Sequence, residues 1–348
     1  MSIRCEECFF SFSMSVSQIK INGIRLSSGL VQAFQLTDTR DASPSIPLYQ
    51  MLARERTNIS CLGLRTDGFT TCVFCCHDPK SQGPPEDPDR DATRILDVCT
   101  VSVYPHHSSL NTLGFLIGLF GEKKLVFRQM VSSNAMISFV IKADQKEVLA
   151  VLEQAFELPC THTPFQQNFS DETAAFVKKR YPETRATYVE EKIKTYGFQM
   201  ESGLEMLEIP CDPHQPARLA VLGKSLQLLA AGGKKFYFTC AMATAKNSGR
   251  LFCLTDPLTP RDRKSFFSQV KAEGCAGDSR FSPVDLIGFH GPHFGDRFGI
   301  FNTAMGCLTA ASVPVLLAGC TGASICMVLP ASFGKHALPA LAQGFETP

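Results

Sequence analysis

The sequence predicts an α+β fold built from four small units of strands and helices, arranged as two tandem pairs. The first observation behind this prediction is a repeat: residues 193–204 (IKTYGFQMESGL) match residues 19–30 (IKINGIRLSSGL), 174 positions earlier. The second is a match 189 positions apart, in which residues 335–348 share Lys, Leu, Gln, Phe and Pro with residues 146–159. The third is the recurrence of strand-like runs and helically spaced apolar residues in each stretch. Internal repeats take priority because missing one misassigns the whole fold.

The first unit, residues 16–80, reads β-α-β-β. Residues 19–36 form two short strand-like runs around a turn at Ser27-Ser28-Gly29. Apolar residues spaced three apart predict a short helix, and two further strands are predicted at residues 59–64 and 69–76. Residues 1–15 have no clear period and are expected to be a poorly fixed leader, while residues 80–91 are Pro-rich and charged, as in a linker.

The second unit, residues 95–160, reads β-α-β-β-α. Its first helix carries Leu113, Leu116, Ile117 and Phe120 on one face, and its strands are predicted at residues 96–104, 125–130 and 136–141. The polar residues 161–188 are expected to link the two pairs.

The second pair comprises residues 189–273 and residues 284–348. The third unit has a leucine-faced helix that stops at Gly232-Gly233, followed by strands at residues 236–241 and 250–254. The fourth unit has a Gly-rich loop, residues 288–299, then a helix, strands at residues 313–318 and 324–329, and a closing helix.

Composition excludes some functions. The net charge of +1, from 34 basic and 33 acidic residues, gives no electrostatic footprint for nucleic acid or an anionic membrane. The apolar runs are too short to span a bilayer, and no export signal is visible, so we expect a cytoplasmic protein. Many of the 15 cysteines lie in apolar runs, which indicates reduced, buried thiols rather than a disulfide framework.

Several segments resemble the regulatory region of aspartokinases. Residues 137–156 and 325–345 are similar to the strand and helix that close the second of its paired ACT domains. Residues 19–36 resemble the opening of such a pair, and Thr57-Asn58-Ile59-Ser60 resembles the exit from the first helix into the second strand. The resemblance covers most of residues 16–160 and 189–348. It implies four ferredoxin-like βαββαβ units, because an ACT domain has that fold.

The resemblance also implies binding of a free amino acid, of the lysine, threonine or methionine class, between ACT units. The family uses the loop before the first helix and the start of the second strand. A helix N-terminus offers unpaired N–H groups to a carboxylate, and an Asp can hold the ammonium group. The corresponding ligand-binding candidates are Asp38, Asp41, Ser60, Ser108, Asn111, Asp212, His214, Asp296 and Gly299.

Two departures from the family pattern concern this site. No unit carries the family's full Asp-x-Pro-Gly loop. Pro314 stands in the fourth unit where Ser60 stands in the first, and proline has no N–H to donate. We therefore expect the fourth unit to be a poorer binding site than its relatives in the first half.

The implied role is regulatory. Nothing like the Lys-Phe-Gly-Gly phosphate-binding segment of the aspartokinase catalytic domain occurs in the chain. We therefore expect a protein that is not an enzyme, with no catalytic residues, cofactor or metal. Its expected partners are a free amino acid, a separate aspartokinase or another enzyme of amino-acid biosynthesis, and further copies of itself.

Two alternatives remain open. In the first, the ACT units bind no ligand and only mediate assembly. In the second, the protein is a thiol- or metal-dependent enzyme that uses Cys and His clusters, which are Cys5 with Cys8, Cys75-Cys76-His77-Asp78, His106-His107 and His290 with His293. Against the second alternative, Cys5 and Cys8 supply only half of a four-ligand zinc site, and Cys75 and Cys76 are typical of a buried strand end. The histidines read more simply as solvated loop residues.

Overall fold

The computed structural model describes most of the chain, in the ranges 18–38, 40, 45–78, 92–144, 147–160, 162, 165–168, 192–243, 249–272, 279–292, 294, 298–322 and 324–348. The expected leader (residues 1–15), the expected linker at residues 80–91 and most of the linker at residues 161–188 lie outside the described residues.

The elements of the first half are β1 (Ile19–Lys20), β2 (Gly23–Asp38), α1 (Leu48–Arg54), β3 (Ile59–Asp67), β4 (Thr70–His77), β5 (Ala92–Tyr104), α2 (Leu110–Glu122), β6 (Gln129–Ser132), β7 (Ile137–Lys142), α3 (Glu147–Ala155), β8 (Phe156–Glu157) and β9 (Phe165–Asn168). Those of the second half are β10 (Ile193–Lys194), β11 (Phe198–Pro210), α5 (Pro216–Ala231), β12 (Phe236–Ala243), β13 (Gly249–Thr255), α6 (Pro260–Ala272), β14 (Arg280–His290), α7 (Ile300–Ala310), β15 (Leu317–Cys320), β16 (Ser324–Pro330), α8 (Gly334–Leu341) and β17 (Phe345–Glu346). The mixture of a large, mainly antiparallel sheet with separate helices confirms the α+β class.

One large sheet organises the described chain. Its strand order is β4-β3-β15-β16-β14-β11-β13-β12-β6-β7-β5-β2-β9. Because β4 also pairs with β2, the sheet closes on itself, and β9 lies against β2 outside this ring. The halves of the chain meet in the ring at two places, where β3 pairs with β15 and where β12 pairs with β6.

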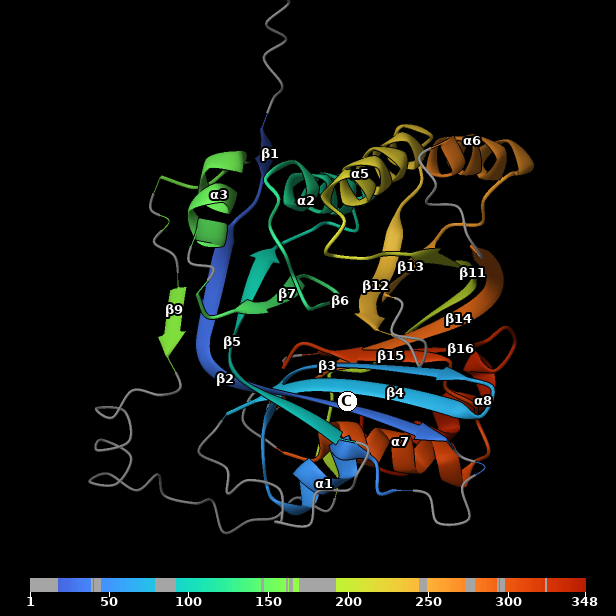
Figure 1. The fold of residues 1–348 in the computed structure, drawn as a ribbon. Helices are drawn as coiled ribbons and strands as arrows, with labels where there is room; N and C mark the ends of the chain where they lie inside the picture. Colours follow the sequence, from blue (N-terminus) through green and yellow to red (C-terminus); the bar gives the residue numbers. More distant parts are fainter. Residues whose placement is uncertain are drawn as a thin grey trace, which may run out of the picture.

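The helices cover the outer faces of the sheet in two groups (Figure 1). α2, α5 and α6 lie at one end of the view, and α1, α7 and α8 lie at the other. Alternate strand residues point to opposite faces, so a single strand serves two cores. In β4, Val73 and Cys75 pack toward α1 and α7, whereas Phe74 and Cys76 belong to the core enclosed by the sheet.

The internal repeat is visible in the strand pairing. β1 pairs in parallel with β8 through Ile19 and Phe156, and β10 pairs in parallel with β17 through Ile193 and Phe345. These residues are counterparts under the two sequence repeats. In each half, the first short strand therefore pairs with the last one in an equivalent register.

The predicted turn at Ser27-Ser28-Gly29 is instead a bulge inside one continuous strand. β2 runs from Gly23 to Asp38 and shifts register against β5 between Ser27 and Leu30. Gly29 has a φ of 70°, which a glycine adopts without steric cost. The second half has the same kind of bulge: β11 shifts register against β14 between Glu201 and Leu204, and Gly203 has a φ of 72°.

Helix α6 has no counterpart in the sequence prediction. Its N-terminus is fixed by a reciprocal cap, in which Asp262 accepts from the backbone N–H of Thr259 and the Thr259 hydroxyl accepts from the N–H of Asp262. Phe266 and Val270, four residues apart, are buried against the core. This capping pattern and the apolar spacing were the available sequence signals.

Candidate functional site

The two contacts between the halves of the chain are repeats of one another. We call them the α1/α7 seam, where β3 pairs with β15, and the α2/α5 seam, where β6 pairs with β12. A shift of 174 positions places the buried Leu48 and Leu52 of α1 on the buried Leu222 and Leu226 of α5. Equivalent helices and strands therefore form the two seams, so a structural difference between the seams can be traced to particular residues.

Glycines close the α2/α5 seam. A Cβ atom on Gly223 of α5 would lie 2.4 Å from the backbone nitrogen of Gly118 in α2, and one on Gly114 would lie 2.6 Å from the carbonyl oxygen of Gly223. The two backbones thus touch directly, and only residues without a side chain allow it. Gln227 Nε2 also donates to Asn111 Oδ1 across this seam at 3.1 Å.

The α1/α7 seam holds a pocket instead. Tyr49 of α1 stands at the repeat position of Gly223, and its ring packs edge-on against Phe301 of α7 with 5.3 Å between centroids. α1 has 7 residues whereas α5 has 16, so the covering helix is also shorter here. Between the large side chain and the short helix lies a small cavity of about 30 Å³, partly open to solvent.

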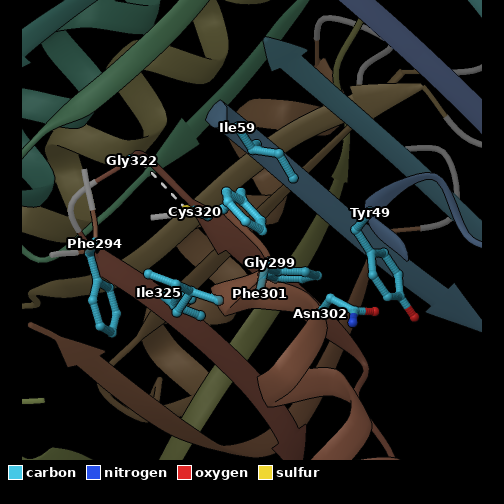
Figure 2. A pocket seen from close by; sticks show the side chains of 11 residues that line it. Tyr49, Ile59, Phe294, Gly299, Phe301, Asn302, Cys320, Gly322 and Ile325 are labelled. Atoms are coloured by element: carbon cyan, nitrogen blue, oxygen red, sulfur yellow. Dashed lines mark hydrogen bonds between the residues drawn. The ribbon is translucent and has the colours of Figure 1, made fainter. Parts of the chain in front are cut away.

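Both halves of the chain contribute to the wall of this pocket (Figure 2). The lining residues are Tyr49, Ile59, Phe294, Phe298, Gly299, Ile300, Phe301, Asn302, Cys320, Gly322 and Ile325. In Figure 2, Tyr49 and Asn302 lie at one end, and Phe294 and Ile325 lie at the other. The pocket therefore has a polar end and an apolar end.

The N-terminus of α7 opens into the pocket, since Gly299 through Asn302 line it. Gly299 is the N-cap with a φ of 79°, and the first intrahelical bond runs from Thr303 N–H to Gly299 C=O at 2.9 Å. No side chain of the described residues caps this end. Amides at a helix N-terminus without a cap attract anions, through their N–H groups and the helix dipole.

Among the three other helices that pack at the seams, α1 and α2 have N-terminal amides bonded to a side chain, and α5 does not. The Gln35 side chain accepts from Leu48 N–H of α1 at 2.7 Å. Ser109 caps α2 by accepting from Thr112 N–H at 3.1 Å. α5 begins at Pro216, which has no N–H, and no described side chain caps it; the Asp212 carboxylate nearby accepts from the Gln215 side chain at 2.8 Å.

The titratable groups in the pocket wall are neutral at pH 7. Burial raises the pKa of the Cys320 thiol to about 12, and the Gly322 N–H donates to its sulfur at 3.4 Å. Burial also raises the pKa of Tyr49. Cys320 is therefore a protonated thiol and Tyr49 a protonated phenol, so neither is an activated nucleophile.

One of the predicted ligand-binding residues lines this pocket, and a second lies beside one of its lining residues. Gly299 lines it, and the Ser60 carbonyl oxygen lies 3.5 Å from the position a Cβ on Gly322 would take. Gly299 belongs to the second half and Ser60 to the first, so the loop of one half meets the second-strand start of the other. Pro314 is exposed and is not among the residues that line the pocket.

The remaining predicted residues lie elsewhere. Asp38 ends β2 on the surface and forms an ion pair with Arg40, whose hydrogen bonds lower the Asp38 pKa to about 2. Ser108 and Asn111 belong to the closed α2/α5 seam, where Phe236 N–H donates to Ser108 C=O at 3.1 Å. Asp212 accepts from the backbone N–H of the exposed His214 at 2.9 Å. Asp41 and Asp296 lie outside the described residues.

Sequence reasoning missed the pocket residues of α1 and α7, notably Tyr49 and Asn302. The helical spacing placed both on helices but gave no sign that these helices face one another. The alignment of Tyr49 with Gly223 was the usable signal, because it exchanges the smallest residue for a large one within the repeat.

The Cys and His clusters do not assemble a metal site among the described residues, since no three His, Cys, Asp or Glu side chains there are placed to hold an ion. Cys75, Cys76 and His77 form the buried end of β4, as the sequence indicated. His106, expected in solvent, is buried: its Nε2 hydrogen bonds the Ser133 carbonyl oxygen at 2.8 Å, and its Nδ1 accepts from Ser108 N–H at 2.9 Å. Cys5, Cys8 and His293 lie outside the described residues.

The fold has solved relatives. It resembles an aspartate kinase. The aspartate kinase from Synechocystis matches with a TM-score of 0.66 and 12% identity over 94% of this chain, which spans 56% of that enzyme's length. The ligand-free regulatory subunit of aspartate kinase from Thermus thermophilus matches 44% of this chain over 99% of its own, with 15% identity and a TM-score of 0.37. E. coli aspartokinase III in complex with lysine and aspartate matches 47% of this chain and 38% of its own, with 14% identity and a TM-score of 0.33. The sequence matches no protein-family model and no curated protein sequence.

The aspartokinase-like fold corrects one expectation. The missing Lys-Phe-Gly-Gly segment predicted a chain that is not an enzyme, yet the structure that matches 94% of the chain is that of a kinase, which is an enzyme. The absence of one phosphate-binding motif was too narrow a basis for that conclusion, because catalytic groups meet in space rather than in a short segment.

Membrane insertion by a helix finds no support in the described residues, where each helix is too short or too polar to cross a bilayer.

Proposed function

We propose that this chain is an amino-acid-sensing regulatory unit of the aspartokinase type, and that a free amino acid binds in the pocket of the α1/α7 seam. The observation that carries the proposal is the N-terminus of α7, which no described side chain caps and which opens into a small cavity, of about 30 Å³, built by both halves of the chain. A cavity of this size holds about one water molecule, so binding of an amino acid requires α1 and α7 to move apart.

The chemistry of the pocket supports an amino acid. The α-carboxylate would accept from the backbone N–H groups at the start of α7. The α-ammonium would donate to the side-chain oxygen of Asn302 or the hydroxyl of Tyr49, at the polar end. Because the two helices belong to different halves, a ligand held between them ties the halves together.

The strand order supports four ferredoxin-like ACT units. The groups β5-β2-β4-β3, β2-β5-β7-β6, β14-β11-β13-β12 and β11-β14-β16-β15 all follow one pattern within the large sheet. In each, a strand is followed by a helix and a hairpin. The long strands β2, β5, β11 and β14 each serve two groups, so the units at residues 16–80, 95–160, 189–273 and 284–348 would share strands.

A thermal-shift screen with each of the twenty amino acids tests the proposal. At least one should raise the melting temperature, because a ligand that binds only the native state stabilises it, by about 2.7 kcal/mol at one hundred times its Kd. Asn302→Ala should reduce this shift. Thr309→Ala, on the exposed side of the same helix, is the matched control and should preserve it.

No shift with any amino acid would contradict the proposal and leave an assembly role. An unchanged shift in Asn302→Ala would show that the ligand binds away from Asn302.

A further inference from the structure

We infer that the groove between α7 and α8 is the docking surface for a second copy of this chain, in a two-fold pair whose α7 helices cross at Gly306. The groove has a volume of about 460 Å³ and is lined by α7, from Thr303 to Ala311, and by Ala340 and Gln343 at the end of α8. None of these groove residues lines the α1/α7 pocket, so the inference concerns assembly and goes beyond the proposed amino-acid site.

The two halves of the chain allow this groove to be compared with its counterpart. Lys124 and Ser312 follow α2 and α7, lie 188 positions apart and both have a left-handed backbone, with φ of 54° and 55°. The next strands, β6 and β15, begin with the same spacing. α7 therefore corresponds to α2, residue by residue, and α8 corresponds to α3.

The groove exists because small residues in the second half stand where the first half has large ones. Phe115 and Leu119 of α2 occupy the positions of Thr303 and Cys307 of α7. The Phe115 ring packs edge-on against Phe156, which follows α3, with 5.3 Å between centroids, and Leu119 is buried. Side chains of the chain itself therefore occupy this space in the first half, whereas the second half leaves room for side chains from outside.

Gly306 is a second observation, because it keeps a residue that the other half uses for contact between helices. It stands at the position of Gly118, whose backbone nitrogen would lie 2.4 Å from a Cβ on Gly223 of α5. Gly306 itself is exposed, and a Cβ there would meet no atom within 4 Å. Glycine weakens a helix interior unless a close approach requires it, so Gly306 points to another helix that lies across α7.

A second copy of α7 suits this surface. The exposed side of α7 carries Gly306, Thr309 and Ala310, which are all small, and the described groove residues are uncharged. A two-fold axis at Gly306 brings the same small residues together from both copies, so the two backbones can approach as they do at Gly118 and Gly223. The net charge of +1 opposes such an association only weakly.

The rest of the fold directs a second copy to the helices. Because β4 pairs with β2, the large sheet closes on itself, and the strands that join the halves pair within the chain. Closure of a sheet limits contact between copies through strand edges. The outer faces of the helices are then the main surface through which two copies can meet.

Sedimentation equilibrium of the full chain tests the inference. The wild-type chain should form dimers, and Gly306→Leu should raise the dimer Kd at least about tenfold, because a leucine there separates the two α7 backbones. The variant should still fold, since the space around Gly306 is open. Ser268→Leu is the matched control: it adds the same side chain to an exposed site on α6, in the other helix group (Figure 1), and should leave the Kd unchanged.

Two results would overturn the inference. A wild-type chain that stays monomeric would leave the groove to a different protein. A dimer that Gly306→Leu does not weaken would place the contact between copies elsewhere on the surface.

A double variant tests the groove separately from Gly306. Thr303→Phe together with Cys307→Leu restores the residues of α2 and should fill the groove, so the dimer Kd should again rise about tenfold or more. Circular dichroism at a concentration where the chain is monomeric should show the helix content of the wild type. A folded double variant that dimerises as tightly as the wild type would contradict docking in the groove.

Discussion

His106 illustrates at the residue scale how this chain uses a polar side chain to build a loop rather than a site. Ser108 N–H donates to His106 Nδ1, so that nitrogen carries no proton, and Nε2 must donate to the carbonyl oxygen of Ser133. The ring lies 4.6 Å from that of Phe236, centroid to centroid. Protonation of Nδ1 would break the bond from Ser108, and burial in addition lowers the His106 pKa below 6.5.

This arrangement predicts a pH dependence. The unfolded chain takes up a proton near pH 6.5, whereas the folded chain resists protonation of His106. The unfolded state therefore binds more protons as pH falls below about 6.5, and the free energy of unfolding should decrease between pH 7 and pH 5. Urea unfolding followed by circular dichroism at several pH values measures this slope.

Two variants assign the slope. His106→Gln should reduce it, even if the variant is less stable at every pH. The neighbour His107 is the control, because His107→Gln removes an exposed imidazole and leaves the buried one in place. A slope that disappears with His107→Gln and survives His106→Gln would refute the assignment.

At the scale of elements, the two seams show how one exchange within a repeat changes what a helix pair can do. Gly223 lets α5 touch α2 through the backbone, whereas Tyr49 at the same repeat position holds α1 away from α7. The close contact makes the α2/α5 seam a fixed joint, and the separation makes the α1/α7 seam a pocket. The strands beneath both seams nevertheless pair in the same antiparallel way.

Glycine-to-alanine variants should therefore have opposite effects in α5 and α7. Gly223→Ala places a Cβ 2.4 Å from backbone in α2 and should destabilise the protein, by about 1–3 kcal/mol if the helices separate slightly. Gly306→Ala in the exposed middle of α7 meets no atom within 4 Å and should stabilise it by about 0.5–1 kcal/mol. Chemical denaturation of both variants checks the signs; stabilisation by Gly223→Ala would contradict the close packing.

At the scale of the whole molecule, the four seam helices predict the number of ligands. Gln35 and Ser109 bond the N-terminal amides of α1 and α2, and α5 begins with a proline beside a seam that glycines close, so among the described seam helices only α7 joins a cavity to an N-terminus without a side-chain cap. Calorimetric titration should give one amino acid per chain. A stoichiometry of two would show that the α1 end of the same seam also binds, which requires Gln35 to move.

The sequence was sufficient for much of the architecture. The match between residues 19–30 and 193–204 predicted the duplication, and the register of Ile19 on Phe156 and Ile193 on Phe345 bears it out. Strands such as β7 and β16 followed from apolar runs, because both are buried on two faces. β6 and β15 begin about four residues later than predicted, since the apolar residues before them pack in loops rather than in the sheet.

The pocket could not be predicted in the same way. Tyr49 and Asn302 are distant in the chain, and their proximity depends on β3 pairing with β15 rather than with a strand of its own half. Periodicity reports which face of an element is buried but not which element covers it. Of the candidate Asp residues, the two that the structure describes lie apart for a related reason: Asp38 and Asp212 are held by local partners, Arg40 and Gln215.

The closed sheet has a consequence for how a signal would depend on concentration. Its two seams join the halves within one chain, so the partner of each half is always present at an effective concentration set by the connecting segment. Dilution therefore cannot separate the two halves, whereas it can separate the subunits of a dimer. Closure of the α1/α7 pocket around a ligand would therefore be a unimolecular event, with a midpoint that reflects ligand concentration and is independent of how much protein the cell contains.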